Sequence, residues 1–228
     1  MYRIIDGKVY GVLADYDLAS WKASLTSDYQ KTSQQRTGTP PFMAQGLLDG
    51  SDALHLYRHD AESLFYVMLI LATHYEIHSP EEGESGGVRV REGKLRFENW
   101  FDAPDYDTLG GIKYNFFAKL GTLEVSPSFK DFHDWLLKLQ WAFSDGFLAK
   151  SYHNRRKRFL PGQGQTKKSD DPNETAPFDD ETLGGHVTYS AIVQSSSCLA
   201  GELEGLVIRY HSPEGSALTS ADAIQVDA

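Results

Sequence analysis

Two carboxylates, Asp15 and Asp17, flank Tyr16 directly after the apolar residues 11–14. An aspartate at the end of a strand, followed by an aromatic residue and a loop, can hold Mg²⁺ against phosphate groups. Mg²⁺ prefers hard oxygen ligands and takes only one or two carboxylates besides phosphate oxygens and water. The alternative is that Asp15 caps a turn, which is the commoner role of aspartate when the local pattern alone is considered. Asp15 is therefore a candidate ligand for phosphate-bound magnesium.

Two further stretches place rigid or polar residues at the start of apolar segments. Gly38, Thr39 and Pro40 precede Met43-Ala44 and could shape a platform at the mouth of a cleft, although an ordinary entry from loop to helix has the same composition. Asp60 stands at the start of an apolar helix. As a buried charge it would need partners, whereas the simpler role is a helix N-cap.

The elements that would position these residues begin with a β-hairpin, because Asp6-Gly7 between two strand-like runs is a strong type I′ turn signal. Residues 20–41 show no period and predict a long surface loop. Residues 42–49 predict a short helix. The run that follows Asp60 is apolar on every side, which is typical of a central buried helix.

The second half of the chain predicts more helices joined by exposed connections. Residues 79–93 are rich in Glu and Gly and predict an exposed loop. A helical turn is expected around Trp100 and a helix over residues 113–120. The clearest amphipathic pattern starts near Ser128, and Gly146 is the expected end of that helix.

The domain organisation follows from a change in composition near residue 151. We expect residues 1–150 to form the folded lobe, 151–180 a disordered linker, 181–194 a terminal helical motif and 195–228 a loose tail. The linker includes the basic run of residues 155–158. That run could be a nuclear-import patch, although a plain solvated linker is the commoner interpretation.

Bulk composition limits the function classes. The chain has 228 residues, of which 40% are hydrophobic, so it can bury a core. Its formal net charge of -10 argues against a nucleic-acid partner. Cys198 is the single cysteine and can form no intrachain disulfide. The longest apolar run, residues 64–72, is far short of the roughly 20 residues that cross a bilayer. We therefore expect an intracellular protein, cytoplasmic or nuclear, with no membrane partner.

Five stretches, in this order, resemble the large lobe of a protein kinase, and most closely the fungal-type protein kinase family. They are KVYGVLADYDLAS (8–20), QRTGTPPFMA (35–44), LYRHDAESLFYV (56–67), SFKDFHDWL (128–136) and TLGGHVTYS (182–190). The resemblance covers most of residues 1–194. It implies a mainly α fold, a protein-kinase-like C-lobe with a short N-terminal β-hairpin and without the small lobe.

The same resemblance implies roles for particular residues. Asp15 would bind the Mg²⁺ that bridges the nucleotide phosphates, so Mg-ATP is the cofactor of the intact family domain. Gly38, Thr39 and Pro40 would shape the end of the activation segment. Asp60 would hydrogen-bond the backbone of the catalytic loop and tie the central helix to the active site. The activity implied for the family is ATP-dependent phosphoryl transfer to Ser or Thr of a protein, and the protein substrate or partner is not indicated.

Other parts that phosphoryl transfer needs are not found in this sequence. Kinases carry a Gly-rich loop, a strand Lys paired with a helix Glu, and a catalytic-loop Asp and Asn before the Asp-aromatic motif. Only fourteen residues precede Asp15. Residues 44–46 read Ala-Gln-Gly where kinases have Ala-Pro-Glu, so we expect weak anchoring of the activation segment.

We therefore identify no catalytic residue and expect the chain alone to bind no Mg-ATP and to be inactive. The alternatives are a non-catalytic, pseudokinase-like interaction module and a truncated gene model.

Overall fold

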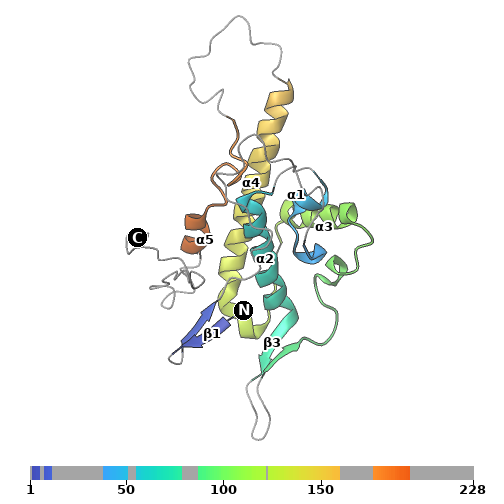
Figure 1. Cartoon of the computed structure of the whole chain (residues 1–228). Coiled ribbons are helices and arrows are strands. Elements are labelled where there is room, and N and C mark those ends of the chain that lie inside the picture. Colours follow the sequence, from blue (N-terminus) through green and yellow to red (C-terminus); the bar gives the residue numbers. More distant parts are fainter. Residues whose placement is uncertain are drawn as a thin grey trace, which may run out of the picture. The chain divides into compact units, whose positions relative to one another are not determined.

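The computed structural model describes residues 2–5, 8–11, 38–50, 55–78, 87–121, 123–159 and 177–195 (Figure 1). The chain divides into two compact units, Met1–Thr37 and Gly38–Ala228. In the first unit, strand β1 (Tyr2–Ile5) pairs antiparallel with strand β2 (Lys8–Gly11). Because Ile5 pairs with Lys8, only two residues connect the strands, which confirms the hairpin predicted there. Asp15 lies outside the described residues.

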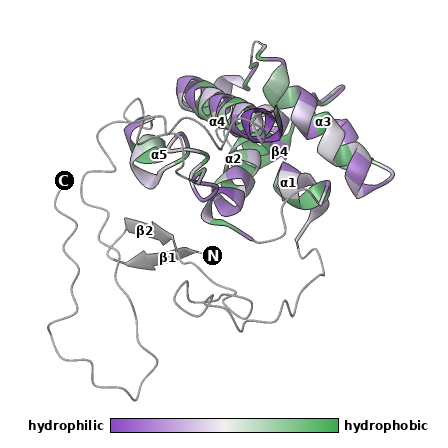
Figure 2. Ribbon diagram, turned by 90° about the horizontal axis from the view of Figure 1, so that it is seen from above, coloured by the Kyte–Doolittle hydropathy of each residue, from purple (hydrophilic) through white to green (hydrophobic). Residues whose placement is uncertain are grey.

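The second unit is mainly helical, which confirms the coarse fold class predicted from the sequence. In chain order its elements are the 3₁₀ turn η2 (Pro40–Phe42), α1 (Gln45–Leu48), α2 (Tyr57–His74), β3 (Tyr75–His78), β4 (Gly87–Val90), η3 (Glu98–Trp100), α3 (Tyr106–Ala118), η4 (Pro127–Phe132), α4 (His133–Phe159) and α5 (Tyr189–Ser195). Helices α2 and α4 lie side by side in the middle, with α1 and α3 on one side and α5 on the other (Figures 1 and 2). Within the described part of the chain, no helix has the length and apolar character needed to cross a membrane.

The core of the second unit is assembled on α2. Phe65 and Tyr66 are fully buried. Phe65 packs against Phe117 of α3 and Phe143 of α4, with ring centroids 6.0 and 5.8 Å apart. Trp100 meets Tyr66 edge-on at 5.0 Å. Aromatic pairs in such tilted and edge-on arrangements add stability beyond the area that they bury, so α2 holds α3 and α4 together.

One face of α2 differs from the prediction of a helix buried on every side. Leu64, Val67 and Leu71 are 49%, 36% and 37% exposed. They are spaced by three and four residues and therefore share one face of the helix. The prediction is wrong for this face, because a run that is apolar at every position carries no period that could show which side is buried.

Helix α4 is longer than predicted at its C-terminal end. It continues through Gly146 to Phe159, so the disordered linker expected from residue 151 is wrong for residues 151–159. The glycine is required by packing, because a Cβ on Gly146 would lie 2.7 Å from Cβ of Leu183. Both hydrophobic and hydrophilic positions appear along this helix (Figure 2). Residues 160–176 lie outside the described residues.

Two elements between α2 and α4 also differ from the predictions. Helix α3 begins at Tyr106, seven residues before the predicted start at Lys113, because the side chain of Asp105 caps it and accepts the N–H of Thr108 at 2.7 Å. Strand β4 lies within the predicted exposed loop and pairs antiparallel with β3. All four residues of β4 are exposed, so the strand has no buried face to give it a hydrophobic pattern.

The last described segment, residues 177–195, packs against the core instead of lying free. Leu183 and Val187 are buried, and Nε1 of Trp135 donates to the carbonyl oxygen of Ile192 at 3.3 Å. Helix α5 confirms that the terminal motif predicted over residues 181–194 contains a helix. The preceding residues form turns, in which Leu183 has the positive φ of 52° that is unusual for a side chain of this size.

Candidate functional site

Gly38, Thr39 and Pro40 form the start of the second unit. Gly38 has a φ of +134°, a conformation that glycine tolerates and other residues rarely adopt. The carbonyl oxygen of Thr39 accepts the N–H of Phe42 at 2.9 Å, and Pro40 opens the 3₁₀ turn η2. We call residues 38–50, from Gly38 to the end of the turn after α1, the anchored segment, because contacts from α2 and α3 hold it in place.

Asp60 does not play the local role predicted for it. Helix α2 begins at Tyr57, so Asp60 lies inside the first turn and is not the N-cap. The backbone N–H of Leu56 donates instead to Nδ1 of His59 at 2.9 Å. The Asp60 side chain is 74% exposed, with its Oδ1 2.8 Å from Nε2 of His55. This hydrogen bond raises the pKa of His55, and the buried partners expected for Asp60 are replaced by one exposed histidine.

Glu62 is the carboxylate of α2 that contacts the anchored segment. It is fully buried, and its Oε1 accepts the backbone N–H of Gln45 at 2.7 Å and the hydroxyl of Tyr66 at 2.5 Å. Burial raises the pKa of Glu62, and the hydrogen bonds oppose that shift. The bond to Gln45 satisfies one of the N–H groups that a helix start leaves without a partner, and it joins α1 to the central helix.

Lys113 of α3 also contacts the anchored segment. Its Nζ donates to the carbonyl oxygens of Met43, at 2.5 Å, and Pro40, at 3.3 Å. It also lies over the Tyr66 and Trp100 rings, 4.0 and 5.1 Å from their centroids. Burial lowers the pKa of Lys113 to about 7, and the nearby Glu62 opposes this shift.

Glu62 and Lys113 correct the expectation of weak anchoring. Gly46 has no side chain to pair with an arginine, but α2 and α3 hold the segment through backbone groups of Pro40, Met43 and Gln45, which precede that residue. Sequence reasoning named neither residue as part of the site. A signal for Lys113 was present, because Lys113 is spaced four residues from Leu109 and from Phe117 and therefore shares their face of the helix.

A pocket of about 520 Å³ opens beside the anchored segment. Its walls are mostly prolines and aromatic rings. They comprise Thr39, Pro40, Pro41, Trp100, Phe101, Ala103, Pro104, Asp105, Tyr106 and Leu109. Phe42 packs edge-on against Phe101 at 6.1 Å and stiffens one wall. Rigid apolar walls with a few polar groups are typical of sites that bind an apolar group.

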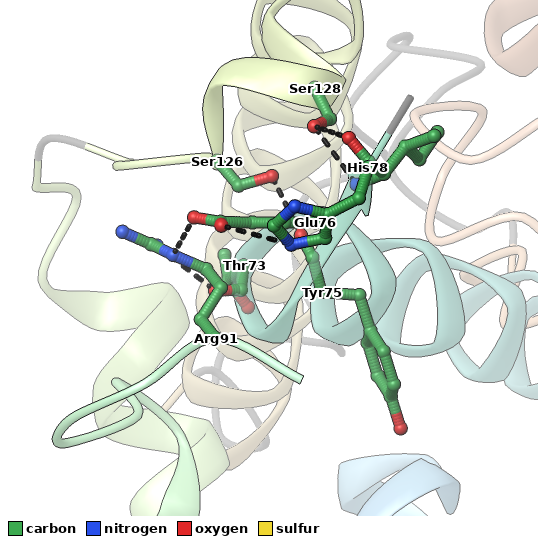
Figure 3. A network of polar contacts seen from close by, with 8 residues as sticks. Thr73, Tyr75, Glu76, His78, Arg91, Ser126 and Ser128 are labelled. Atoms are coloured by element: carbon green, nitrogen blue, oxygen red, sulfur yellow. Dashed lines mark hydrogen bonds and ion pairs between the residues drawn. The ribbon is translucent and has the colours of Figure 1, made fainter. Parts of the chain in front are cut away.

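A network of polar contacts lies at the C-terminal end of α2 (Figure 3). Nε of Arg91 donates to Oε1 of Glu76 at 3.0 Å, and Nη1 of Arg91 donates to the carbonyl oxygen of Thr73 at 3.2 Å. The hydroxyl of Ser126 donates to the carbonyl oxygen of Tyr75 at 2.7 Å. These bonds satisfy the backbone at the helix end and join β3 and β4 to α2, which is a structural task.

The described residues supply no donor set for Mg-ATP. They contain no group of three or more His, Cys, Asp or Glu side chains that could hold a metal ion. Asp15, the one magnesium ligand that the resemblance implies, is not among them. The described site consists of a backbone segment held by Glu62 and Lys113, with a mostly apolar pocket at its side.

The family model of the fungal protein kinases matches residues 4–72. The matched stretch contains Asp15, the anchored segment and most of α2, and over these residues it confirms the family resemblance predicted from the sequence. It ends inside α2, so α3, α4 and α5 lie beyond it. No curated protein and no solved structure matches the chain.

Proposed function

We propose that this relative of the fungal protein kinases provides the substrate-side lobe of a kinase-like domain, and that the pocket beside the anchored segment binds an apolar side chain of a protein. The observation that carries this proposal is the double attachment of residues 38–50, by Glu62 to the N–H of Gln45 and by Lys113 to the carbonyls of Pro40 and Met43. A binding surface that is already rigid loses little conformational entropy when its ligand arrives.

The nature of the pocket defines the ligand. Prolines and aromatic rings form most of its walls, and Asp105 is the one charged residue among the described residues of its lining. An extended peptide could place one large apolar residue there while its backbone stays in water. The pocket gives no fixed cluster of charges that would select a strongly charged side chain.

The peptide proposal is tested with an array of fluorescent peptides that differ at one central position. We expect peptides with Leu, Phe or Met at that position to bind the full chain more tightly than those with Asp, Lys or Gly. Tyr106 lines the pocket, whereas Tyr152 on α4 is 67% exposed and lies outside its lining. Tyr106→Ala should therefore weaken binding by about tenfold, as expected for an aromatic contact at the binding site, and Tyr152→Ala should leave it unchanged. Equal effects of both variants, or binding without preference for apolar residues, would contradict the proposal.

Phosphoryl transfer is the activity that the family resemblance suggests, and we propose that it needs more than this chain. The sequence carries no Gly-rich loop, no strand Lys in a Val-Ala-Ile-Lys-like run and no His-Arg-Asp. These groups cover the phosphates and position the acceptor hydroxyl. The chain alone, given radiolabelled ATP, magnesium and a mixture of protein substrates, should incorporate no phosphate above a protein-free blank. Clear turnover would overturn this part of the proposal.

A non-catalytic interaction module is the second candidate, because the apolar pocket needs no nucleotide to bind a peptide. The two functions differ in what the gene encodes before Met1. A transcript whose reading frame continues upstream into a Gly-rich loop, a strand Lys and a catalytic-loop Asp and Asn would favour the kinase. Stop codons directly upstream of Met1 would favour the module.

A further inference from the structure

A second pocket, also of about 520 Å³, lies between α1, α3 and α4. Its lining differs from that of the first pocket because it is polar and basic. It comprises Gln45, Asp49, Tyr114, Phe147, Lys150, Ser151, Asn154, Arg155 and Arg158. We call it the basic pocket. The residues from α4 recur every three or four positions, so one continuous face of that helix forms its longest wall.

The charged side chains in the basic pocket differ in whether another described residue pairs with them. Asp49 accepts a hydrogen bond from the side-chain amide of Gln45. Nζ of Lys150 lies 3.0 Å from Oδ1 of Asp180. Among the described residues, no ion pair or hydrogen bond engages Arg155 or Arg158. These two guanidinium groups at the pocket are therefore engaged by no described residue, and both are always charged at physiological pH.

The helix end alone does not account for these arginines. Lys and Arg in the last turn of a helix interact favourably with its dipole, and Arg156, Lys157 and Arg158 satisfy that rule in α4. Of the basic run of residues 155–158, only Arg155 and Arg158 line the pocket, whereas Arg156 and Lys157 do not. A general effect of charge at the helix end would not distinguish the two pairs.

We propose that the basic pocket binds the phosphate monoester of a phosphorylated serine or threonine in a polypeptide. Arginine presents a planar fork of donors that matches a phosphate group, and such charge-assisted bonds are the strong ones. The hydroxyl of Ser151 and the amide of Asn154 add neutral donors from the same face of α4. The ring of Phe147 supplies an apolar wall for the chain next to the phosphate.

The chemistry of the whole chain favours a single phosphate over a nucleic acid. The chain has 32 acidic and 22 basic residues and a net charge of -10. A long polyanion meets this excess of negative charge and gains affinity only where many phosphates are neutralised. One phosphate group meets only the local arginines. This inference uses residues outside the apolar pocket and does not rest on the function proposed above.

The test compares two fluorescein-labelled peptides of the same sequence, one with phosphoserine and one with serine, by anisotropy with the full chain. We expect the phosphorylated peptide to bind at least about tenfold more tightly, as charge-assisted bonds allow. Arg155→Gln with Arg158→Gln should remove this preference. Arg156→Gln with Lys157→Gln changes the net charge equally and should preserve it. Circular dichroism confirms that both double variants are folded.

The other outcomes separate the possible ligands. Equal loss in both double variants would overturn the proposal, because it would show that only the general charge matters. Inorganic phosphate should compete with the phosphopeptide in the millimolar range. Binding of inorganic phosphate without any preference for the phosphopeptide would overturn the polypeptide source. Tighter binding of a single-stranded RNA oligonucleotide than of the phosphopeptide would overturn it as well.

Discussion

Lys113 lies in an environment that is unusual for a lysine. A lysine normally keeps its ammonium group in water, but here Nζ lies among two backbone carbonyls and two aromatic rings. The carbonyl bonds are useful to the fold because they fix the chain at Pro40 and Met43. The charge is costly because burial disfavours it. These opposite effects predict how stability depends on pH.

Lys113→Met should destabilise the second unit by about 1–3 kcal/mol, because two buried carbonyls lose their donor. The loss should grow with pH. Burial lowers the pKa of Lys113 from its ordinary 10.5 to about 7, so between these values the unfolded chain binds more protons than the folded chain. Wild-type stability therefore rises relative to the variant as pH increases through this window. Urea unfolding at pH 7, 8 and 9, followed by tryptophan fluorescence, measures the difference.

Subtracting the variant from the wild type cancels the titration of shared groups that do not interact with Lys113. A difference that stays constant from pH 7 to 9 would show that Lys113 is not desolvated as described. Protection of the amide of Phe42 from hydrogen exchange provides a second readout, since it should fall in Lys113→Met if the anchored segment loosens.

The stability cost of replacing Asp60 distinguishes a residue inside the first turn of α2 from an N-cap. Replacement of an N-cap by a residue that cannot cap costs about 0.5–2 kcal/mol. Asp60 lies inside the first turn and pairs with His55. Asp60→Ala should therefore cost less than about 1 kcal/mol, from weak interactions with the exposed histidine and the helix dipole.

The same variant should lower the pKa of His55, because the hydrogen bond to Asp60 is the main cause of its raised value. A histidine with a raised pKa in the folded state contributes stability at low pH that is lost as pH rises through that pKa. A pH titration of the His55 ring by NMR measures the shift directly. An unchanged midpoint in Asp60→Ala would contradict the pairing.

At the scale of elements, the sequence predicted what local patterns encode. Asp6-Gly7 predicted the hairpin, and the apolar run after Asp60 predicted the central helix, because each signal lies within a few neighbouring residues. The boundaries of α3 and α4 were missed. Asp105 was not recognised as a cap, and Gly146 was interpreted as a helix end. Glu62 and Lys113 belong to the candidate site only because α2 and α3 meet the anchored segment, and no local pattern shows this.

Gly146 tests whether contacts between distant segments, which the local sequence does not show, determine the residue at a helix position. An exposed helical glycine replaced by alanine usually gains about 0.5–1 kcal/mol. Gly111 in α3 has no atom within 4 Å of the place where a Cβ would stand, so Gly111→Ala should show this gain. Gly146→Ala should instead destabilise the protein by about 1–3 kcal/mol, because the new methyl group meets Cβ of Leu183 at 2.7 Å. Thermal unfolding of both variants measures the difference, and a gain in both would mean that residues 177–195 are not packed against α4.

At the scale of the whole molecule, the second unit is closed by a segment far along the chain. The N–H of Tyr57 donates to Oε2 of Glu181 at 3.0 Å, and Nε of Arg58 donates to the carbonyl oxygen of Asp180 at 2.8 Å. These contacts join residues 124 and 122 positions apart. Leu183, which follows Asp180 and Glu181, is buried in the core. The start of α2 therefore depends on residues that follow α4.

This dependence predicts the effect of shortening the chain. A protein that ends at residue 176 loses the buried side chains of Leu183 and Val187, each worth about 1.5–3 kcal/mol. A protein that ends at residue 195 retains them, so comparison of the two isolates the contribution of residues 177–195. We expect the shorter protein to unfold at a much lower urea concentration, because 3–6 kcal/mol is about half of the stability of an ordinary domain.

A shorter protein that fails to fold would leave the size of this effect unmeasured, so a point variant accompanies it. Leu183→Ala should cost about 2–5 kcal/mol, the range for truncating a fully buried leucine. Tyr189, which is 64% exposed in α5, provides the matched control, and Tyr189→Ala should change stability by less than about 0.5 kcal/mol. Equal midpoints for Leu183→Ala and Tyr189→Ala would mean that the second unit ends at α4. A selective loss in Leu183→Ala would instead show that the fold depends on residues that follow α4.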